Sequence, residues 1–147
     1  MLPMRKFKYL PHTADAAFIG FGKDFGEAIE NAALAMLNIR FDLKSIEADK
    51  GQTKSITIME QADTRENLAW YALQDILSKV DSKSLSAFKF TVIRLSVSKD
   101  GRLTLAGKLF YKLTRKDHTL TDVKAVTPHE FKVEHKKDWR IRVVVDI

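Results

Sequence analysis

An apolar repeat near the N-terminus constrains the fold more strongly than any other stretch of the chain. Its apolar residues recur every three or four positions, as on one face of an α-helix: Phe25, Ala28, Ile29, Ala32, Ala33, Met36 and Leu37. Asp24 precedes the repeat and Glu27 follows three residues later, which is the spacing of a capping box. The pattern predicts a helix from about Asp24 to Phe41 with one buried face.

A second helix and several strands are indicated by similar patterns. Thr64 is the expected N-cap of a helix whose apolar stripe contains Leu68, Ala72, Ile76 and Val80. The stretches "AAFIGFGK" and "KSITIME" have strand character. "FKFTVIRLSVSKDGRLTLAGKLFYKL" predicts a long hairpin that turns at Asp100 and Gly101, with a bulge near Val92 where the alternation changes phase.

Two last strands, from Phe131 to Glu134 and from Trp139 to Asp146, complete the expected elements. The chain has 147 residues, no internal repeat and no linker, so we expect a single domain spanning residues 1–147. The predicted fold class is α+β, with two helices packed on a mostly antiparallel β-sheet.

Composition excludes several classes of protein. No apolar run approaches the roughly 20 residues of a membrane span, and no secretory signal precedes the first strand, so we expect a soluble, cytoplasmic protein with no membrane contact. Cys is absent, which excludes disulfides, thiolate zinc sites and a Cys nucleophile. The net charge of +6 favours an anionic partner.

The last strand places two anions side by side. Its alternation assigns Trp139, Ile141, Val143 and Val145 to the core and Arg140, Arg142, Val144 and Asp146 to the other face. The Asp146 carboxylate then neighbours the α-carboxylate of Ile147, and such like charges repel unless a cation offsets them. One interpretation pairs them with Arg140 or Arg142. The other is a metal ion, which requires a third carboxylate.

Asp15, in the stretch "HTAD", is the best candidate for that third carboxylate, because it lies in a loop between two strand-like segments. Thr13 and Asp15 are equally typical of a turn that their side-chain oxygens cap. His12 and His129 have no zinc-binding spacing to support a role as ligands. Lys124, Thr127 and His129 in "KAVTPH" suit either an anion pocket or a packed turn.

Other enzyme signatures are missing, since the sequence has no GxxxxGK[ST] loop, no GxGxxG and no GxSxG. The basic stretches "KLTRK" and "HKKDWR" could contact phosphate, although no aromatic pattern typical of RNA-reading strands accompanies them.

In combination, "HTAD", "GKDFGEAIENAALAM", "KAVTPH" and a final "RVVVDI" resemble the archease family over essentially the whole chain. The resemblance implies an activator of the tRNA-splicing RNA ligase of the RtcB type, which promotes guanylylation of the ligase and its multiple turnover without being a ligase itself. It also implies a divalent cation, Ca²⁺, Mg²⁺ or Mn²⁺, held by Asp15, Asp146 and a main-chain oxygen of Ile147. The residues implied to shape the pocket are His12, Thr13, Lys124, Thr127 and His129.

The chain departs from the family pattern at Leu10, Pro11, Pro128 and Lys108, which concern the lining of the pocket more than its expected ligands. Two other functions remain open at this stage. One is an RNA-binding or tRNA-modification accessory module that uses the basic loops on tRNA. The other is a metal-dependent hydrolase that acts through Asp15 and Asp146.

Overall fold

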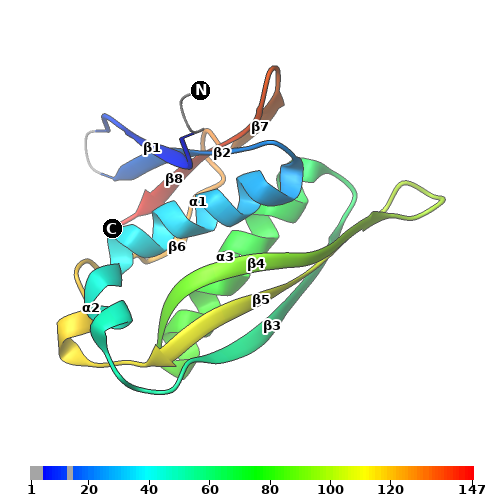
Figure 1. Ribbon diagram of the computed structural model, residues 1–147. Coiled ribbons are helices and arrows are strands. Elements are labelled where there is room, and N and C mark those ends of the chain that lie inside the picture. Colours follow the sequence, from blue (N-terminus) through cyan, green and yellow to red (C-terminus); the bar gives the residue numbers. More distant parts are fainter. Residues whose placement is uncertain (1–4, 13–14) are drawn as a thin grey trace.

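The computed structural model describes residues 5–12 and 15–147, and in it two antiparallel sheets lie on either side of helix α1 (Figure 1). The elements in chain order are β1 (Phe7–Leu10), β2 (Ala16–Gly22), α1 (Phe25–Arg40), α2 (Leu43–Ala48), β3 (Lys54–Ala62), α3 (Arg65–Lys83), β4 (Leu85–Val97), β5 (Leu103–Leu113), the short 3₁₀ helix η1 (Lys116–His118), β6 (Ala125–Val126), β7 (Lys132–His135) and β8 (Trp139–Asp146).

The first sheet has the order β1-β2-β8, and both β6 and β7 pair with the free edge of β8. The second sheet has the order β3-β5-β4, and every pairing in both sheets is antiparallel. The predicted α+β class is therefore confirmed. Helix α2 was not among the predicted elements.

Helix α1 begins where the capping pattern predicts. The side chain of Asp24 accepts a hydrogen bond from the main-chain N–H of Glu27 at 2.8 Å, and Glu27 Oε1 accepts one from the N–H of Lys23 at 3.0 Å. The buried stripe is wider than predicted, because Gly26 and Ala35 are buried as well. This width follows from the position of the helix, which packs on β2 with one side and on β4 with another.

The approach of α1 to β2 depends on Gly20. A Cβ atom at this position would lie 2.5 Å from the main-chain nitrogen of Ala32 and 2.8 Å from the carbonyl oxygen of Ala28. Both contacts are with helix backbone, which cannot move aside as a flexible side chain would. The glycine therefore sets how closely the first sheet and α1 can pack.

The β4–β5 hairpin has the predicted turn and bulge. Gly101 adopts a φ of 86°, in the left-handed region that favours glycine. The register between the strands shifts between Val92 and Arg94, where the sequence predicts a bulge, and a second shift lies between Ala87 and Lys89. Helix α3 begins after Thr64, whose hydroxyl accepts a hydrogen bond from the N–H of Asn67, as the predicted cap requires.

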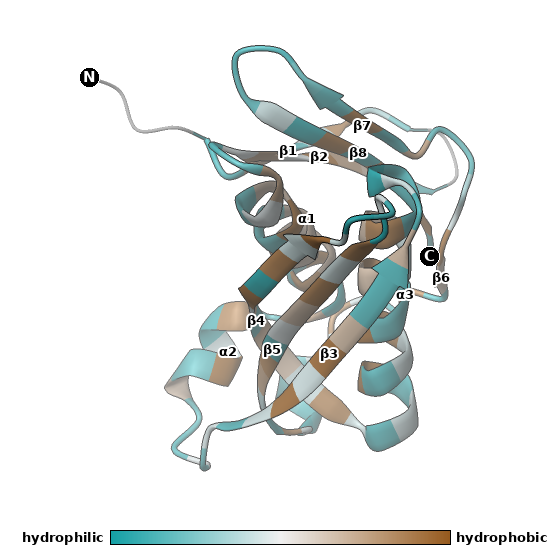
Figure 2. Ribbon diagram, turned by 90° about the vertical axis from the view of Figure 1, so that its right-hand side faces the viewer, coloured by the Kyte–Doolittle hydropathy of each residue, from teal (hydrophilic) through white to brown (hydrophobic). Residues whose placement is uncertain are grey.

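Strand β8 lies in the middle of the first sheet and its side chains alternate between two faces as predicted, although Val144, on the face opposite the helices, is also buried. Ile141, Val143 and Val145 are completely buried toward the helices. The turn that joins β7 to β8 is hydrophilic and extends away from this core (Figure 2). No helix in residues 5–12 and 15–147 combines the length and the hydropathy needed to cross a bilayer.

Candidate functional site

The register of β2 against β8 brings the two ends of the chain together. Ala16 pairs with Val145 and Ala17 with Val144, so the strands run antiparallel up to this edge of the sheet. Asp15 directly precedes β2 and Asp146 is the last residue of β8. The residues next to the pair of Ala16 and Val145, which are Asp15 and Asp146, therefore lie at the same edge of the sheet, and both are half-buried.

Strand β6 brings the "KAVTPH" stretch to the other side of β8. Ala125 pairs with Asp146, and the main-chain N–H of Lys124 donates a hydrogen bond to the carbonyl oxygen of Asp146 at 2.8 Å. The N–H of Thr127 donates to the carbonyl oxygen of Val144 at 2.9 Å. These bonds fix the main chain of Asp146 from a second side, while the neighbouring Ile147 remains 44% exposed.

His12 and His129 both lie near Glu130, a residue that is not among the predicted pocket residues. Glu130 Oε2 lies 3.7 Å from His12 Nε2, 3.9 Å from His129 Nε2 and 3.8 Å from Arg142 Nη2. Glu130 has a φ of 58°, a conformation that non-glycine residues rarely adopt and that often marks functional loops. Its only sequence signal is its place directly after His129.

The remaining residues predicted to shape the pocket do not all lie at the edge formed by β2 and β8. Thr13 lies outside the described residues. The hydroxyl of Thr127 donates to the carbonyl oxygen of His129 at 3.4 Å, within the turn that follows β6. Lys108 is in β5 of the other sheet, between Thr57 and Thr91, and so it is not part of the edge formed by β2 and β8.

The expected pairing of Asp146 with Arg140 or Arg142 is not found. Arg140 Nε lies 2.9 Å from Asp138 Oδ1, and Arg142 lies beside Glu130. Within residues 5–12 and 15–147 no ion pair uses Asp15, Asp146 or the terminal carboxylate. Among the described residues neither carboxylate therefore has a paired basic side chain that would offset its negative charge.

The chemistry of these donors fits a hard divalent cation. Asp15 and Asp146 would offer carboxylate oxygens and Ile147 a main-chain oxygen, which are the ligand types that Ca²⁺, Mg²⁺ and Mn²⁺ prefer. In the described part of the chain no three His, Cys, Asp or Glu side chains are grouped to hold a metal ion. The donor set has only two side-chain ligands, so a bound cation would depend on main-chain oxygen and water.

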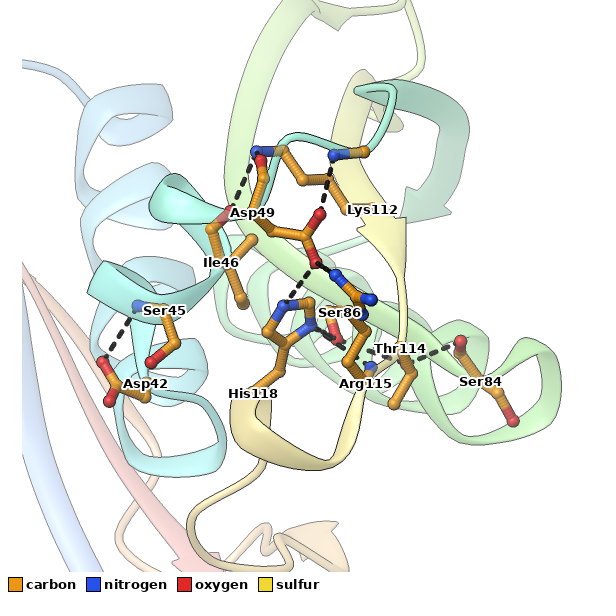
Figure 3. A network of polar contacts seen from close by, with 11 residues as sticks. Asp42, Ser45, Ile46, Asp49, Ser84, Ser86, Lys112, Thr114, Arg115 and His118 are labelled. Atoms are coloured by element: carbon orange, nitrogen blue, oxygen red, sulfur yellow. Dashed lines mark hydrogen bonds and ion pairs between the residues drawn. The ribbon is translucent and has the colours of Figure 1, made fainter.

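A second polar cluster, which we call the His118 network, consists of Asp49, Ser86, Lys112, Arg115 and His118 (Figure 3). His118 Nδ1 lies 2.9 Å from Ser86 Oγ, and its Nε2 lies 3.0 Å from Asp49 Oδ2. These groups have the composition of a hydrolase triad. Ser86 and His118 are completely buried, however, so no substrate reaches the hydroxyl, and the network is structural.

The basic stretch "KLTRK" belongs to this network. Lys112 is buried, and its Nζ donates hydrogen bonds to the carbonyl oxygens of Ile46, at 2.8 Å, and Asp49, at the C-terminal end of α2. The main-chain N–H of Gly51 and the Arg115 guanidinium hold the pKa of the Asp49 carboxyl below its usual value. Two of the cations in this stretch are therefore engaged within the protein.

Comparison with known proteins identifies the family of this chain. The model of the archease protein family (MTH1598/TM1083) matches residues 7–147. The chain belongs to the archease family. Among curated members, the archease of Methanosarcina mazei is 32% identical, with 97% of each chain covered. The archease of Sulfurisphaera tokodaii is 33% identical, with 98% of this chain and all of that protein covered. An archease-like protein of Dictyostelium discoideum is 34% identical, over 98% and 95% of the two chains.

The archease fold is also found among solved structures. The solution structure of Methanobacterium thermoautotrophicum protein 1598 superposes with a TM-score of 0.79 and 27% sequence identity, covering 98% of this chain and all of that one. Membership in the archease family supports the role of an archease-type accessory protein.

Proposed function

We propose that this archease activates a tRNA-splicing RNA ligase by promoting guanylylation of the ligase and its repeated turnover, and that it does not catalyse ligation itself. The observation that supports the proposal is the pairing of Ala16 with Val145, because it brings the adjoining residues Asp15 and Asp146 to the same edge of the first sheet. Membership in the archease family supports an accessory role, and the two carboxylates at this edge are the site through which we propose that the protein acts.

In this proposal Asp15, Asp146 and a main-chain oxygen of Ile147 hold a divalent cation. The cation supplies positive charge near the phosphates on which negative charge develops during guanylyl transfer. The main-chain bond from Lys124 orients Asp146, and the pairing of β8 on both sides keeps the donors in position before any partner arrives.

The position of the site suits presentation to another protein. It lies at an edge of the first sheet where β8 ends, and the side chain of Ile147 is partly exposed. Cytoplasmic location is part of the same proposal, because the ligase substrates are tRNA molecules. The protein partner in this proposal is the ligase.

The proposal is tested by following ligase guanylylation with GTP in the presence and absence of this protein. Asp15→Asn and Asp146→Asn remove one ligand charge each while preserving side-chain shape. Asp117→Asn, at an exposed position of η1, is the matched control. Calorimetric titration with Ca²⁺ and with Mn²⁺ measures cation binding to each variant independently of the ligase.

We expect both site variants to bind the cation about tenfold or more weakly and to lose acceleration of guanylylation, because ligand charge sets cation affinity. The control is expected to behave as the wild type. The proposal is wrong if the wild-type protein gives no acceleration, or if both site variants accelerate the ligase as well as it does.

A further inference from the structure

The outer face of the first sheet, which points away from the helices, presents a row of basic side chains. On β8 the side chains of Val143 and Val145 face the core, so those of Arg140 and Arg142 project from the opposite face. The strand registers align Lys8 with Ile19, Ile19 with Arg142, and Arg142 with Lys132. Neighbouring strands lie about 4.8 Å apart, so this row, which spans four strands, extends about 14 Å across the sheet.

A hollow of about 320 Å³ adjoins the row. It is lined by three cationic side chains, one acidic side chain and two apolar ones: Arg5, Lys8, Arg140, Asp138, Ile19 and Phe21. The guanidinium of Arg140 lies 5.1 Å from the centre of the Phe21 ring, which holds it over the face of the sheet. Arg140 also pairs with Asp138 at 2.9 Å, so the hollow's positive charge that no described acidic side chain pairs with comes from Arg5 and Lys8.

The cations of the row are available to a ligand. The side chains of Lys132 and Arg142 are 64% and 39% exposed, and Lys8 is exposed without an ion pair to any described residue. Lys132 pairs with Glu134 at 2.7 Å, and Arg142 lies 3.8 Å from Glu130. Such exposed pairs contribute less than about 1 kcal/mol, so a polyanion can compete for these cations.

The same face favours contact with phosphates over contact with bases. Phe21 is the aromatic residue beside the row, and it is only 7% exposed beneath Arg140. Base recognition by single-strand binding proteins needs exposed aromatic rings, whereas backbone recognition needs rows of cations. Arg142 also precedes Asp146 by four residues on one face of β8, a separation of about 13 Å. The row itself runs across the strands, and Val144, which lies between Arg142 and Asp146 on this face, is buried, so an RNA bound along the row would stay clear of Asp146.

We infer that the outer face of the first sheet, through Lys8, Lys132, Arg140 and Arg142, binds the phosphodiester backbone of single-stranded RNA without sequence preference. This inference goes beyond the proposed activation of a ligase and does not depend on it. It assigns to this protein a contact with the RNA itself.

The test measures fluorescence anisotropy of a labelled single-stranded RNA with the isolated protein, in EDTA so that no metal ion bridges the carboxylates and the phosphates. The face variant combines Lys8→Gln, Lys132→Gln and Arg142→Gln. The matched control combines Lys44→Gln, Lys50→Gln and Lys54→Gln, which make the same change in net charge at exposed positions in and after α2, a helix that packs against η1 and β4.

We expect the face variant to lose about tenfold or more in affinity at low salt, and the control to change much less. Each phosphate neutralised on a single strand contributes about 0.7 to the slope of log affinity against log salt, so removing three contacts should flatten that slope by about 2. A charge-preserving variant, Lys8→Arg with Lys132→Arg and Arg142→Lys, should bind RNA as the wild type does.

Three results would overturn the inference. The first is that the wild-type protein shows no RNA binding at low salt. The second is that both triple variants lose affinity equally, which would mean that net charge alone sets the binding. The third is that the face variant keeps its RNA affinity but binds the ligase more weakly, which would make the face a protein interface. The RNA assay contains no ligase. A failure of the RNA-binding inference can therefore be distinguished from a failure of the proposed ligase activation.

Discussion

Glu30 of helix α1 accepts a hydrogen bond from the main-chain N–H of Val92 in β4, with Oε2 2.8 Å from the nitrogen. Val92 lies where the register of β4 against β5 shifts. A bulge interrupts the ladder of main-chain hydrogen bonds, and the carboxylate supplies an acceptor at that interruption. The helix and the irregular strand therefore stabilise each other.

Replacing Glu30 by Ala should lower the free energy of unfolding by about 1–3 kcal/mol, because it leaves the partly buried amide of Val92 without an acceptor. Urea denaturation followed by circular dichroism measures this change. Glu30→Gln keeps an acceptor oxygen and should cost less. Equal losses in the two variants would show that the negative charge, rather than the hydrogen bond, is what stabilises the strand.

Replacing His118 by Ala should destabilise the protein by about 2–4 kcal/mol. The side chain is completely buried, so its removal leaves a cavity and separates Ser86 from Asp49. Lys116→Ala, at an exposed position of the same 3₁₀ helix, should change the stability by less than about 0.5 kcal/mol. Thermal and urea unfolding give both values. An equally small effect at His118 would mean that the network contributes little to stability.

Glu60 should make the protein less stable as the pH rises. Burial raises the pKa of this carboxyl from 4.5 to about 7, assisted by a hydrogen bond to Asp75 and by the charge of Asp75. Between these two pKa values the folded state binds more protons than the unfolded state, so the free energy of unfolding falls with rising pH and stays at its lower level above about 7. Glu60→Gln cannot ionise and should remove this decline.

Urea midpoints measured across that pH range check the prediction for Glu60. Glu47→Gln, at an exposed position of α2, is the control and should retain the wild-type pH dependence. If Glu60→Gln shows the same decline as the wild type, another group is responsible for it.

Gly20→Ala should cost about 1–3 kcal/mol or more, because its Cβ would meet the backbone of α1 at 2.5 Å. Gly26→Ala is a matched control within α1, where the nearest atoms lie at 3.4 and 3.6 Å and alanine favours the helix. That variant should be neutral or slightly stabilising. Differential scanning calorimetry separates the two outcomes, and similar unfolding temperatures would contradict the role given to Gly20.

The elements with strong periodicity could be predicted from the sequence. The caps at Asp24 and Thr64 and the phase change at Val92 are local signals, and each is confirmed. Helix α2 was missed because it has six residues and a single buried one, Ile46, which is too few to show a period. Strand β6 has two residues and is defined only by its pairing with β8.

The candidate site was harder to predict, because its parts are far apart in the sequence. The loop position of Asp15 makes it a candidate partner for Asp146, but no pattern along the chain shows that the two residues meet. Nothing in the polar segment around His118 indicates that this residue is buried, since its partners Ser86 and Asp49 come from distant elements. The proximity of Glu130 to His12 likewise depends on two loops meeting in space.

Helix α1 occupies the space between the two sheets. This position determines which side chains can be substituted without loss of packing and which cannot. Enlarging a side chain on the helix would strain two interfaces at once. Most outward-facing side chains of the sheets border solvent and can be replaced without repacking the centre, whereas Phe21 and Val144 on the outer face of the first sheet are buried. For protein engineering, the side chains of α1 should therefore be kept, and new binding specificities should be introduced at exposed positions on the outer faces of the two sheets.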